Sequence, residues 1–198
     1  MAEFGKKRFP KGYQKLVGMN ASRRLHDNSK ELVQVLIDND VFFEGMNVFE
    51  LGAGPARNLK YINDVDSSVN LYCNDLWQEE SVSQMSEEVR NKIHFYEMDS
   101  LNFLKTHDFG FSVDLFVCSD HLMHIPYNDA DQILRLIRDK HKPKYIIFRE
   151  IRKEFETPNH PRLFHNYDLF SETYNTLCDK LSRSDNSYFI RLLKQNEK

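Results

Sequence analysis

The residues best suited to chemistry in this chain are Glu50 and the glycine loop Gly52-Ala53-Gly54, which follow an apolar run. Glycines after a strand allow a ligand to approach the backbone closely, and the next helix directs free amides toward that ligand. A dinucleotide site has a third glycine three residues later, where this chain has Arg57. The carboxylate of Glu50 would repel a pyrophosphate and attract a cation. The pattern therefore favours a ligand that carries an amine or a sulfonium.

Two histidines, His121 and His124, lie in the loop after the apolar run that ends at Ser119. Imidazole titrates near neutrality, so either ring could take a proton from an acceptor hydroxyl or amine. The alternative is a structural role, because the loop around them is apolar. Both residues are candidate catalytic bases.

Other chemistries have little support in the sequence. There is no GxxxxGK phosphate loop, no GxSxG nucleophile motif and no local signature of a Ser/His/Asp triad. The three cysteines, Cys73, Cys118 and Cys178, form no CxxC pair, and no Cys/His cluster has metal-ligand spacing. We expect free thiols and no metal site.

Apolar runs of strand length alternate with amphipathic stretches of helical length from Asn28 onward, which predicts an α/β fold. We expect five parallel strands with helices on both faces, followed by an antiparallel pair. The first helix should begin near Asn28, with Glu31 as its capping-box partner, and end near Asp40. The predicted strands are 47–51, 71–74, 93–98, 113–119, 144–151, 180–184 and 187–193, and the later helices are 55–62, 79–91, 128–140 and 169–181. Pro55 would be the first residue of its helix.

The run Val48-Phe49-Glu50-Leu51-Gly52-Ala53-Gly54 resembles the first motif of class I S-adenosylmethionine-dependent methyltransferases, a hydrophobic strand that ends in an acid before GxG. Asp75 and Asp99 follow at the expected intervals, residues 113–119 resemble the fourth-strand motif, and residues 121–126 resemble a loop of many small-molecule members. The resemblance covers about residues 29–194. It implies a single-domain Rossmann-like sheet, with S-adenosylmethionine as cofactor and S-adenosylhomocysteine as product.

The resemblance also implies roles for individual residues. The methionine portion of the cofactor would lie against Gly52, Ala53 and Gly54, with Glu50 near its ammonium group or orienting the loop. Asp75 offers two acceptors to the two ribose hydroxyls, although a loop cap at the strand end is the alternative. Asp99 would accept from the adenine amino group, and Ser119 would lie beside the methyl group. Further adenine contacts are implied for Leu76, Trp77, Ser100 and Leu101.

The acceptor pocket must come from the N-terminal arm, the loop 120–128 and the segment 152–168, because no inserted domain is present. His160, His165 and Tyr167 would lie at its rim in the family fold. This arrangement favours a small-molecule acceptor. The Asn/Asp-Pro-Pro-aromatic motif of amino-directed DNA methyltransferases is absent after Ser119, and Cys118 lacks the preceding proline of cytosine C5 enzymes.

The first 24 residues contain seven basic side chains and one acidic side chain, whereas the whole chain of 198 residues has a net charge of −3. We divide the chain into a basic arm or lid, residues 1–27, and a cofactor-binding domain, residues 28–198. The arm supports an alternative, an RNA- or protein-directed methyltransferase, and a non-catalytic cofactor-binding partner protein is a third hypothesis. No apolar run approaches the roughly 18 residues of a membrane helix, so we expect a cytoplasmic protein; its oligomeric state stays open.

Overall fold

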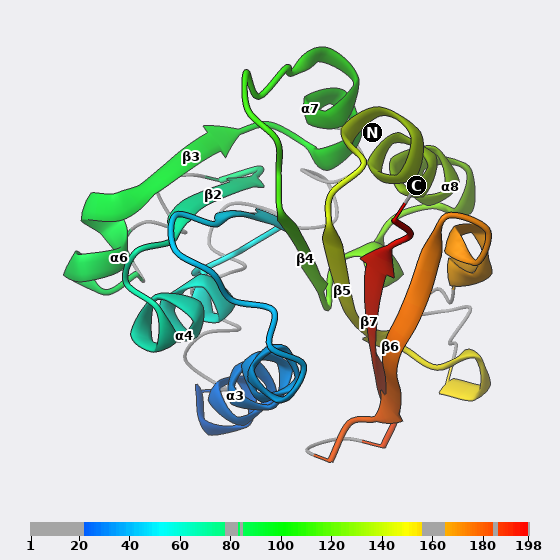
Figure 1. The fold of residues 1–198 in the computed structure, drawn as a ribbon, viewed down its shortest axis with the longest axis horizontal. Coiled ribbons are helices and arrows are strands. Elements are labelled where there is room, and N and C mark those ends of the chain that lie inside the picture. Colours follow the sequence, from blue (N-terminus) through cyan, green and yellow to red (C-terminus); the bar gives the residue numbers. More distant parts are fainter. Residues whose placement is uncertain (1–21, 78–82, 84, 156–164, 184–185, 198) are drawn as a thin grey trace.

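A single mixed sheet organises the molecule (Figure 1). The computed structural model describes residues 22–77, 83, 85–155, 165–183 and 186–197. The strand order is β3-β2-β1-β4-β5-β7-β6. The strands are β1 Asn47–Leu51, β2 Asn70–Asp75, β3 Ile93–Glu97, β4 Leu115–Ser119, β5 Tyr145–Ile151, β6 Tyr174–Leu181 and β7 Tyr188–Gln195. The first five pair in parallel, and β7 is antiparallel to both β5 and β6, which confirms the predicted fold class.

Strand β1 lies where the strand order reverses, because the chain continues to β2 on one side and reaches β4 on the other. Leu51 is in register with Asn74 of β2 and with Cys118 of β4. The carboxyl ends of these strands therefore meet at one edge of the sheet, where open parallel sheets bind ligands. The glycine loop, Asp75 and Ser119 all lie at this edge.

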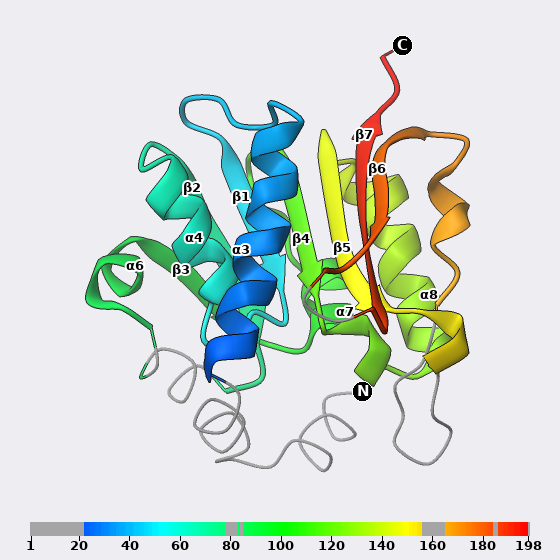
Figure 2. The ribbon, with the colours of Figure 1, turned by 90° about the horizontal axis from the view of Figure 1, so that it is seen from below.

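Helices cover both faces of the sheet, as predicted. Helices α3 Ser22–Asp38, α4 Arg57–Val65 and α6 Glu87–Lys92 share one apolar cluster with alternate residues of the strands, among them Val48, Leu71, Val117 and Ile147. Helices α7 Ser100–Thr106 and α8 Tyr127–Leu136 pack on the other face with Phe49, Phe116, Ile146 and Phe148. Figure 2 shows α3 in front of the sheet and α8 behind it. The central strands β1, β4 and β5 thus bury both faces, which explains their nearly continuous apolar sequences.

The predicted helix 169–181 is wrong. Only a 3-10 turn, Tyr167–Phe170, precedes strand β6, which begins six residues earlier than the predicted strand 180–184. A helix would have needed to bury Leu177 and Leu181, but both side chains are exposed on the edge strand. Pairing with β7 along most of its length overrides the helical spacing of these residues.

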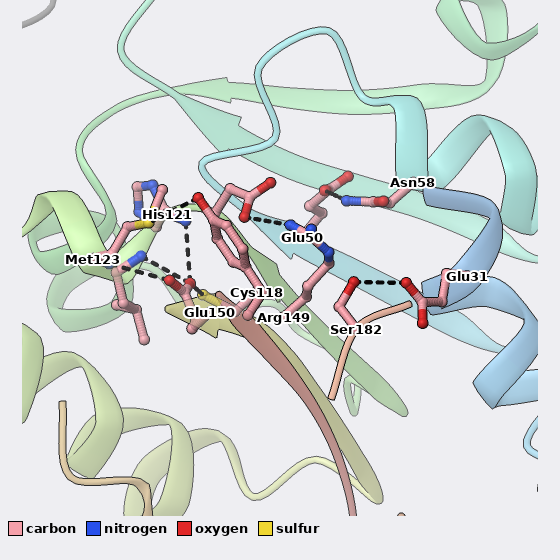
Figure 3. Close-up of polar contacts among 12 residues, drawn as sticks. Glu31, Glu50, Asn58, Cys118, His121, Met123, Arg149, Glu150 and Ser182 are labelled. Atoms are coloured by element: carbon pink, nitrogen blue, oxygen red, sulfur yellow. Dashed lines mark hydrogen bonds and ion pairs between the residues drawn. The ribbon is translucent and has the colours of Figure 1, made fainter. Parts of the chain in front are cut away.

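The first helix begins earlier than predicted, at Ser22, inside the arm 1–27; residues 1–21 lie outside the described part of the chain. Asn28 therefore does not start the helix, and the proposed capping box is wrong. The carboxylate of Glu31 instead accepts from Ser182 Oγ and the backbone amide of Arg183, both at 2.6 Å. This contact joins α3 to the β6–β7 turn (Figure 3).

Smaller corrections concern the other helices. Helix α4 begins at Arg57 rather than Pro55, because Ala56 has a left-handed φ of 51°. Helix α7 was not predicted, and helix 128–140 divides into α8 and a π-helical segment, Ile137–His141. The last part of the predicted helix 79–91 forms α6, Glu87–Lys92. Residues 78–82 and 84 lie outside the described part of the chain.

No helix in the described part of the chain is long and apolar enough to cross a membrane. The same residues contain no group of three or more His, Cys, Asp or Glu side chains that could hold a metal ion. All three cysteines are free thiols.

Candidate functional site

The glycine loop leaves β1 through a sharp turn with left-handed backbone geometry. Gly52 has a φ of 61° and Gly54 a φ of 52°. The amide of Ala53 donates to the carbonyl of Asn74 at 3.1 Å, which fixes the loop to the end of β2. The loop is therefore a rigid platform at the carboxyl edge of the sheet.

Asp75, the last residue of β2, holds this loop directly. Its Oδ2 accepts from the backbone amide of Gly54 at 2.9 Å, and its Oδ1 accepts from the amide of Leu76 at 2.6 Å. The carboxylate is partly exposed. Asp75 thus anchors the glycine loop to the end of β2.

Glu50 is the buried acid beneath the loop. Its Oε1 accepts from Asn58 Nδ2 of α4 at 2.5 Å, and its Oε2 is buried with no hydrogen-bond partner among the described residues (Figure 3). Burial raises the pKa of Glu50 to about 8, while the hydrogen bond from Asn58, the backbone amide of Leu59 and the charge of Arg57 act in the opposite direction. A cation beside Oε2 would satisfy this oxygen and favour the ionised form.

His121 lies against the glycine loop. A Cβ at Gly52 would come within 1.9 Å of His121 Nδ1, so only glycine fits there. The Nε2 atom is 2.8 Å from Ser100 Oγ, which also accepts from Asn74 Nδ2 at 3.1 Å. Burial lowers the pKa of His121 to about 4, so the ring is neutral at pH 7. His121 therefore contacts Gly52, which follows β1, and Ser100, which follows β3. Through Ser100 it is linked to Asn74 near the end of β2.

The loop after β4 is held by Glu150, a residue that the sequence did not single out. Its Oε1 accepts from the backbone amides of His121 and Leu122 at 3.1 and 3.0 Å, and its Oε2 accepts from the amide of Met123 at 3.2 Å (Figure 3). Cys118 Sγ donates to Oε1 at 3.5 Å. Burial raises the pKa of Glu150 to about 8. One carboxylate thus fixes the backbone that presents His121.

Arg149, beside it in β5, was also not singled out. The side chain is fully buried, and its Nη1 donates to Asp120 Oδ1 at 2.6 Å. The guanidinium carbon lies 4.3 Å from the ring centroid of Tyr188. Within the described part of the chain, Nε and Nη2 are buried without a hydrogen-bond partner. Arg149 and Glu150 are the two charged residues of an otherwise apolar strand, and this pattern could have identified them in the sequence as functional candidates.

The structure gives Asp99 a local role. Its Oδ1 caps α7 by accepting from the amide of Asn102 at 3.0 Å, and its Oδ2 accepts from Asn102 Nδ2 at 2.7 Å. The adenine contact predicted for Asp99 stays a prediction, as do those of Leu76, Trp77, Ser100 and Leu101. Leu76, Trp77 and Ser119 are partly buried.

The rim residues differ from expectation. His165 is buried, and its Nε2 is 2.7 Å from the carbonyl oxygen of Leu122. Tyr167 is buried against Phe148, so His165 supports the loop and Tyr167 packs in the core, and neither lines a rim. His160 lies outside the described residues, and His124, partly buried at the end of the 3-10 turn Leu122–His124, stays a candidate base.

Comparisons with known proteins agree on the fold. No protein-family model and no curated protein matches the sequence. Among solved structures, 1,6-didemethyltoxoflavin-N1-methyltransferase from Burkholderia thailandensis matches with a TM-score of 0.71 and 11% identity, over 99% of this chain and 89% of that chain. An S-adenosylmethionine-dependent methyltransferase from Clostridium acetobutylicum has a TM-score of 0.64 and 13% identity, over 96% and 99% of the two chains.

A third similar structure is the small RNA methyltransferase HEN1, with a TM-score of 0.64 and 14% identity. The match covers 86% of this chain and 25% of HEN1. At these identities the similarity establishes architecture. The chain has the Rossmann-like fold of class I S-adenosylmethionine-dependent methyltransferases.

Proposed function

We propose that this protein binds S-adenosylmethionine and transfers its methyl group to a small molecule. One observation carries the proposal: the Asp75 carboxylate hydrogen-bonds the Gly54 amide of the glycine loop at the switch point of the sheet. The buried Glu50 oxygen without a described partner adds a place for an ammonium group. The glycine loop, Asp75 and Glu50, which would contact the methionine portion, the ribose and the ammonium group, therefore lie on neighbouring strands in a fold that methyltransferases share.

The bound cofactor would supply an electrophilic methyl group that needs no further activation. The chain's own residues would then position the reactants and exclude water. Asp75 would accept from the ribose hydroxyls, and Glu50 would accept from the ammonium group. Ser119 would lie beside the acceptor, which must approach in line with the breaking bond within about 3–3.5 Å of the methyl carbon.

Of the two candidate bases we favour His121, because its ring lies against the glycine loop. Its ring is neutral at pH 7, because burial lowers its pKa to about 4. It can therefore accept a proton from an acceptor hydroxyl or amine, although a weak base gives only a small driving force. His121 would then chiefly orient groups through Ser100, and positioning would account for most of the rate.

The direct test is calorimetry of the full chain with S-adenosylmethionine and S-adenosylhomocysteine. We expect micromolar to submillimolar binding of both. No heat of binding for either at millimolar concentration would overturn the proposal. Binding without methyl transfer to any of a broad set of small acceptors would favour the non-catalytic alternative.

The second candidate, an RNA-directed enzyme, rests on the basic arm, with seven basic residues among the first 24. It predicts RNA binding that weakens steeply with salt and is lost when residues 1–15 are deleted. Unchanged RNA affinity after this deletion would exclude the arm as the contact.

A further inference from the structure

Arg149 carries an unused pair of hydrogen-bond donors. Nη1 is committed to Asp120, but Nε and Nη2 are buried without a partner among the residues that the structure describes. These two N–H groups lie on the same edge of the planar guanidinium and point in parallel. That edge is the fork that binds a carboxylate through two hydrogen bonds.

A purely structural role does not account for this arrangement. Pairing with Asp120 uses a single nitrogen, and the Tyr188 contact uses the face of the group rather than its edge. Buried charged donors are strongly unfavourable when they lack partners. An anion at the Nε–Nη2 edge would remove that penalty.

The strand register places this fork next to the predicted methyl position. Arg149 is paired with Ser119 of β4, one strand spacing of about 4.8 Å away, and β1 lies on the other side of β4. Side chains at every second position of β5, residues 145, 147 and 149, point to the sheet face that α3 and α4 cover. Val48 and Glu50 of β1 point to the same face. Arg149 therefore lies beyond Ser119 as seen from the glycine loop, on the sheet face of Glu50.

The surrounding charges favour a monoanion. Asp120 forms an ion pair with Arg149, and the charges of Glu50 and Asp120 both act on Arg57. Glu50, the other nearby acid, has a pKa raised to about 8 by burial and is mostly protonated at pH 7. When Glu50 ionises beside the bound ammonium group, these two charges cancel, so one added negative charge still balances Arg57, Arg149 and Asp120, whereas a phosphate dianion would leave negative charge in excess.

We infer that Arg149 binds a carboxylate of the methyl acceptor through its Nε–Nη2 edge, so that the substrate is a small carboxylic acid. The inference rests on the proposed function. Because the fork is covered in the structure, a neighbouring side chain must move aside when the acid enters. Asp120, with 27% of its side chain exposed, lies at the solvent side of the guanidinium.

The test uses the full chain saturated with S-adenosylhomocysteine and titrated with sodium benzoate, with benzamide as the neutral isostere and inorganic phosphate as the alternative anion. We expect benzoate to bind at least tenfold more tightly than either. Arg149→Lys keeps the charge but removes the fork, and it should weaken benzoate binding at least tenfold. Arg135→Lys, at an exposed ion pair with Asp131, is the control and should change nothing.

Four outcomes would overturn the inference: equal affinity for benzoate and benzamide, preference for phosphate, unchanged benzoate affinity in Arg149→Lys, or a tenfold loss of S-adenosylhomocysteine affinity in that variant. The last would assign Arg149 to the cofactor's own carboxylate. If Arg149→Lys does not fold, the Arg149 Nε–H resonance of the unmodified protein, assigned through its contact with Tyr188, replaces it. This resonance must shift with benzoate and stay unchanged with benzamide. Absence of S-adenosylhomocysteine binding would instead count against the proposed function.

Discussion

Replacing Asp75 by asparagine separates its two roles, loop anchor and ribose acceptor. The carboxylate accepts from the amides of Gly54 and Leu76 at 2.9 and 2.6 Å. An amide side chain has only one acceptor oxygen, so one of these backbone donors loses its partner. Because the site is partly exposed and water can replace the lost acceptor, we expect the free energy of unfolding to fall by about 1–2 kcal/mol.

The effect on cofactor binding should be larger. Hydrogen bonds to a charged group contribute about 1.5–3 kcal/mol each, and Asp75→Asn removes the charge and one of the two ribose acceptors. We expect a loss of about 2–3 kcal/mol in binding free energy, or roughly 30- to 150-fold in Kd. Calorimetry with S-adenosylhomocysteine measures this loss, and urea unfolding measures the stability change.

Asp64→Asn is the control, because Asp64 forms an exposed ion pair with Lys60 at 2.5 Å on α4. Such a pair contributes about 0–1 kcal/mol to stability, and its loss should leave Kd unchanged. If Asp75→Asn loses stability but keeps its Kd within twofold of the unmodified protein, Asp75 only anchors the loop, and the reasoning on the ribose fails.

Three further variants test the loop and the buried acids. Gly52→Ala should be at least about 2 kcal/mol less stable in urea unfolding than Gly110→Ala. Both glycines have positive φ, but only at Gly52 would the added Cβ come within 1.9 Å of His121 Nδ1. Equal losses of stability would mean that the His121 ring moves aside freely. Burial gives Glu50 a folded pKa of about 8, so the folded protein holds a proton that the unfolded chain releases near pH 4.5, and the free energy of unfolding should fall between these pH values. Glu50→Gln should reduce that slope by up to about 1.4 kcal/mol per pH unit in urea unfolding at pH 5 to 8, and an unchanged slope would contradict the assignment. Glu150→Gln should cost about 1–3 kcal/mol and increase hydrogen exchange at the amides of residues 121–123, whereas unchanged protection would show that Glu150 does not hold this loop.

The sequence predicted the parallel core well, because strands buried on both faces have distinctive apolar runs. Strand β1 has the predicted bounds, and Asp75 lies at the end of its strand as expected. The edge of the sheet was harder. In strand β6, Leu177 and Leu181 are exposed, so their spacing does not indicate whether the segment is a helix or a strand. Its structure depends on pairing with β7.

The candidate site was predicted only in part, for a related reason. The glycine loop and Asp75 can be read from local spacing, because each lies at a turn where its residue type is unusual. The histidine contacts cannot, since they join Gly52, Ser100 and His121, which are distant in sequence and meet only when β1, β3 and β4 end at one edge. Their geometry depends on tertiary structure.

Arg149 and Glu150 show how one strand can serve two parts of a site. Successive side chains of a strand point to opposite faces, so Glu150 enters the layer of α7 and α8 and holds the loop of His121, while Arg149 points toward α3 and α4 (Figure 3). Neither polar side chain would be tolerated in a buried strand without partners. Three backbone amides donate to the oxygens of Glu150, whose pKa burial raises to about 8, whereas Asp120 pairs with only one nitrogen of Arg149. Within the described structure, this difference leaves Arg149 as the group whose burial a bound anion would explain.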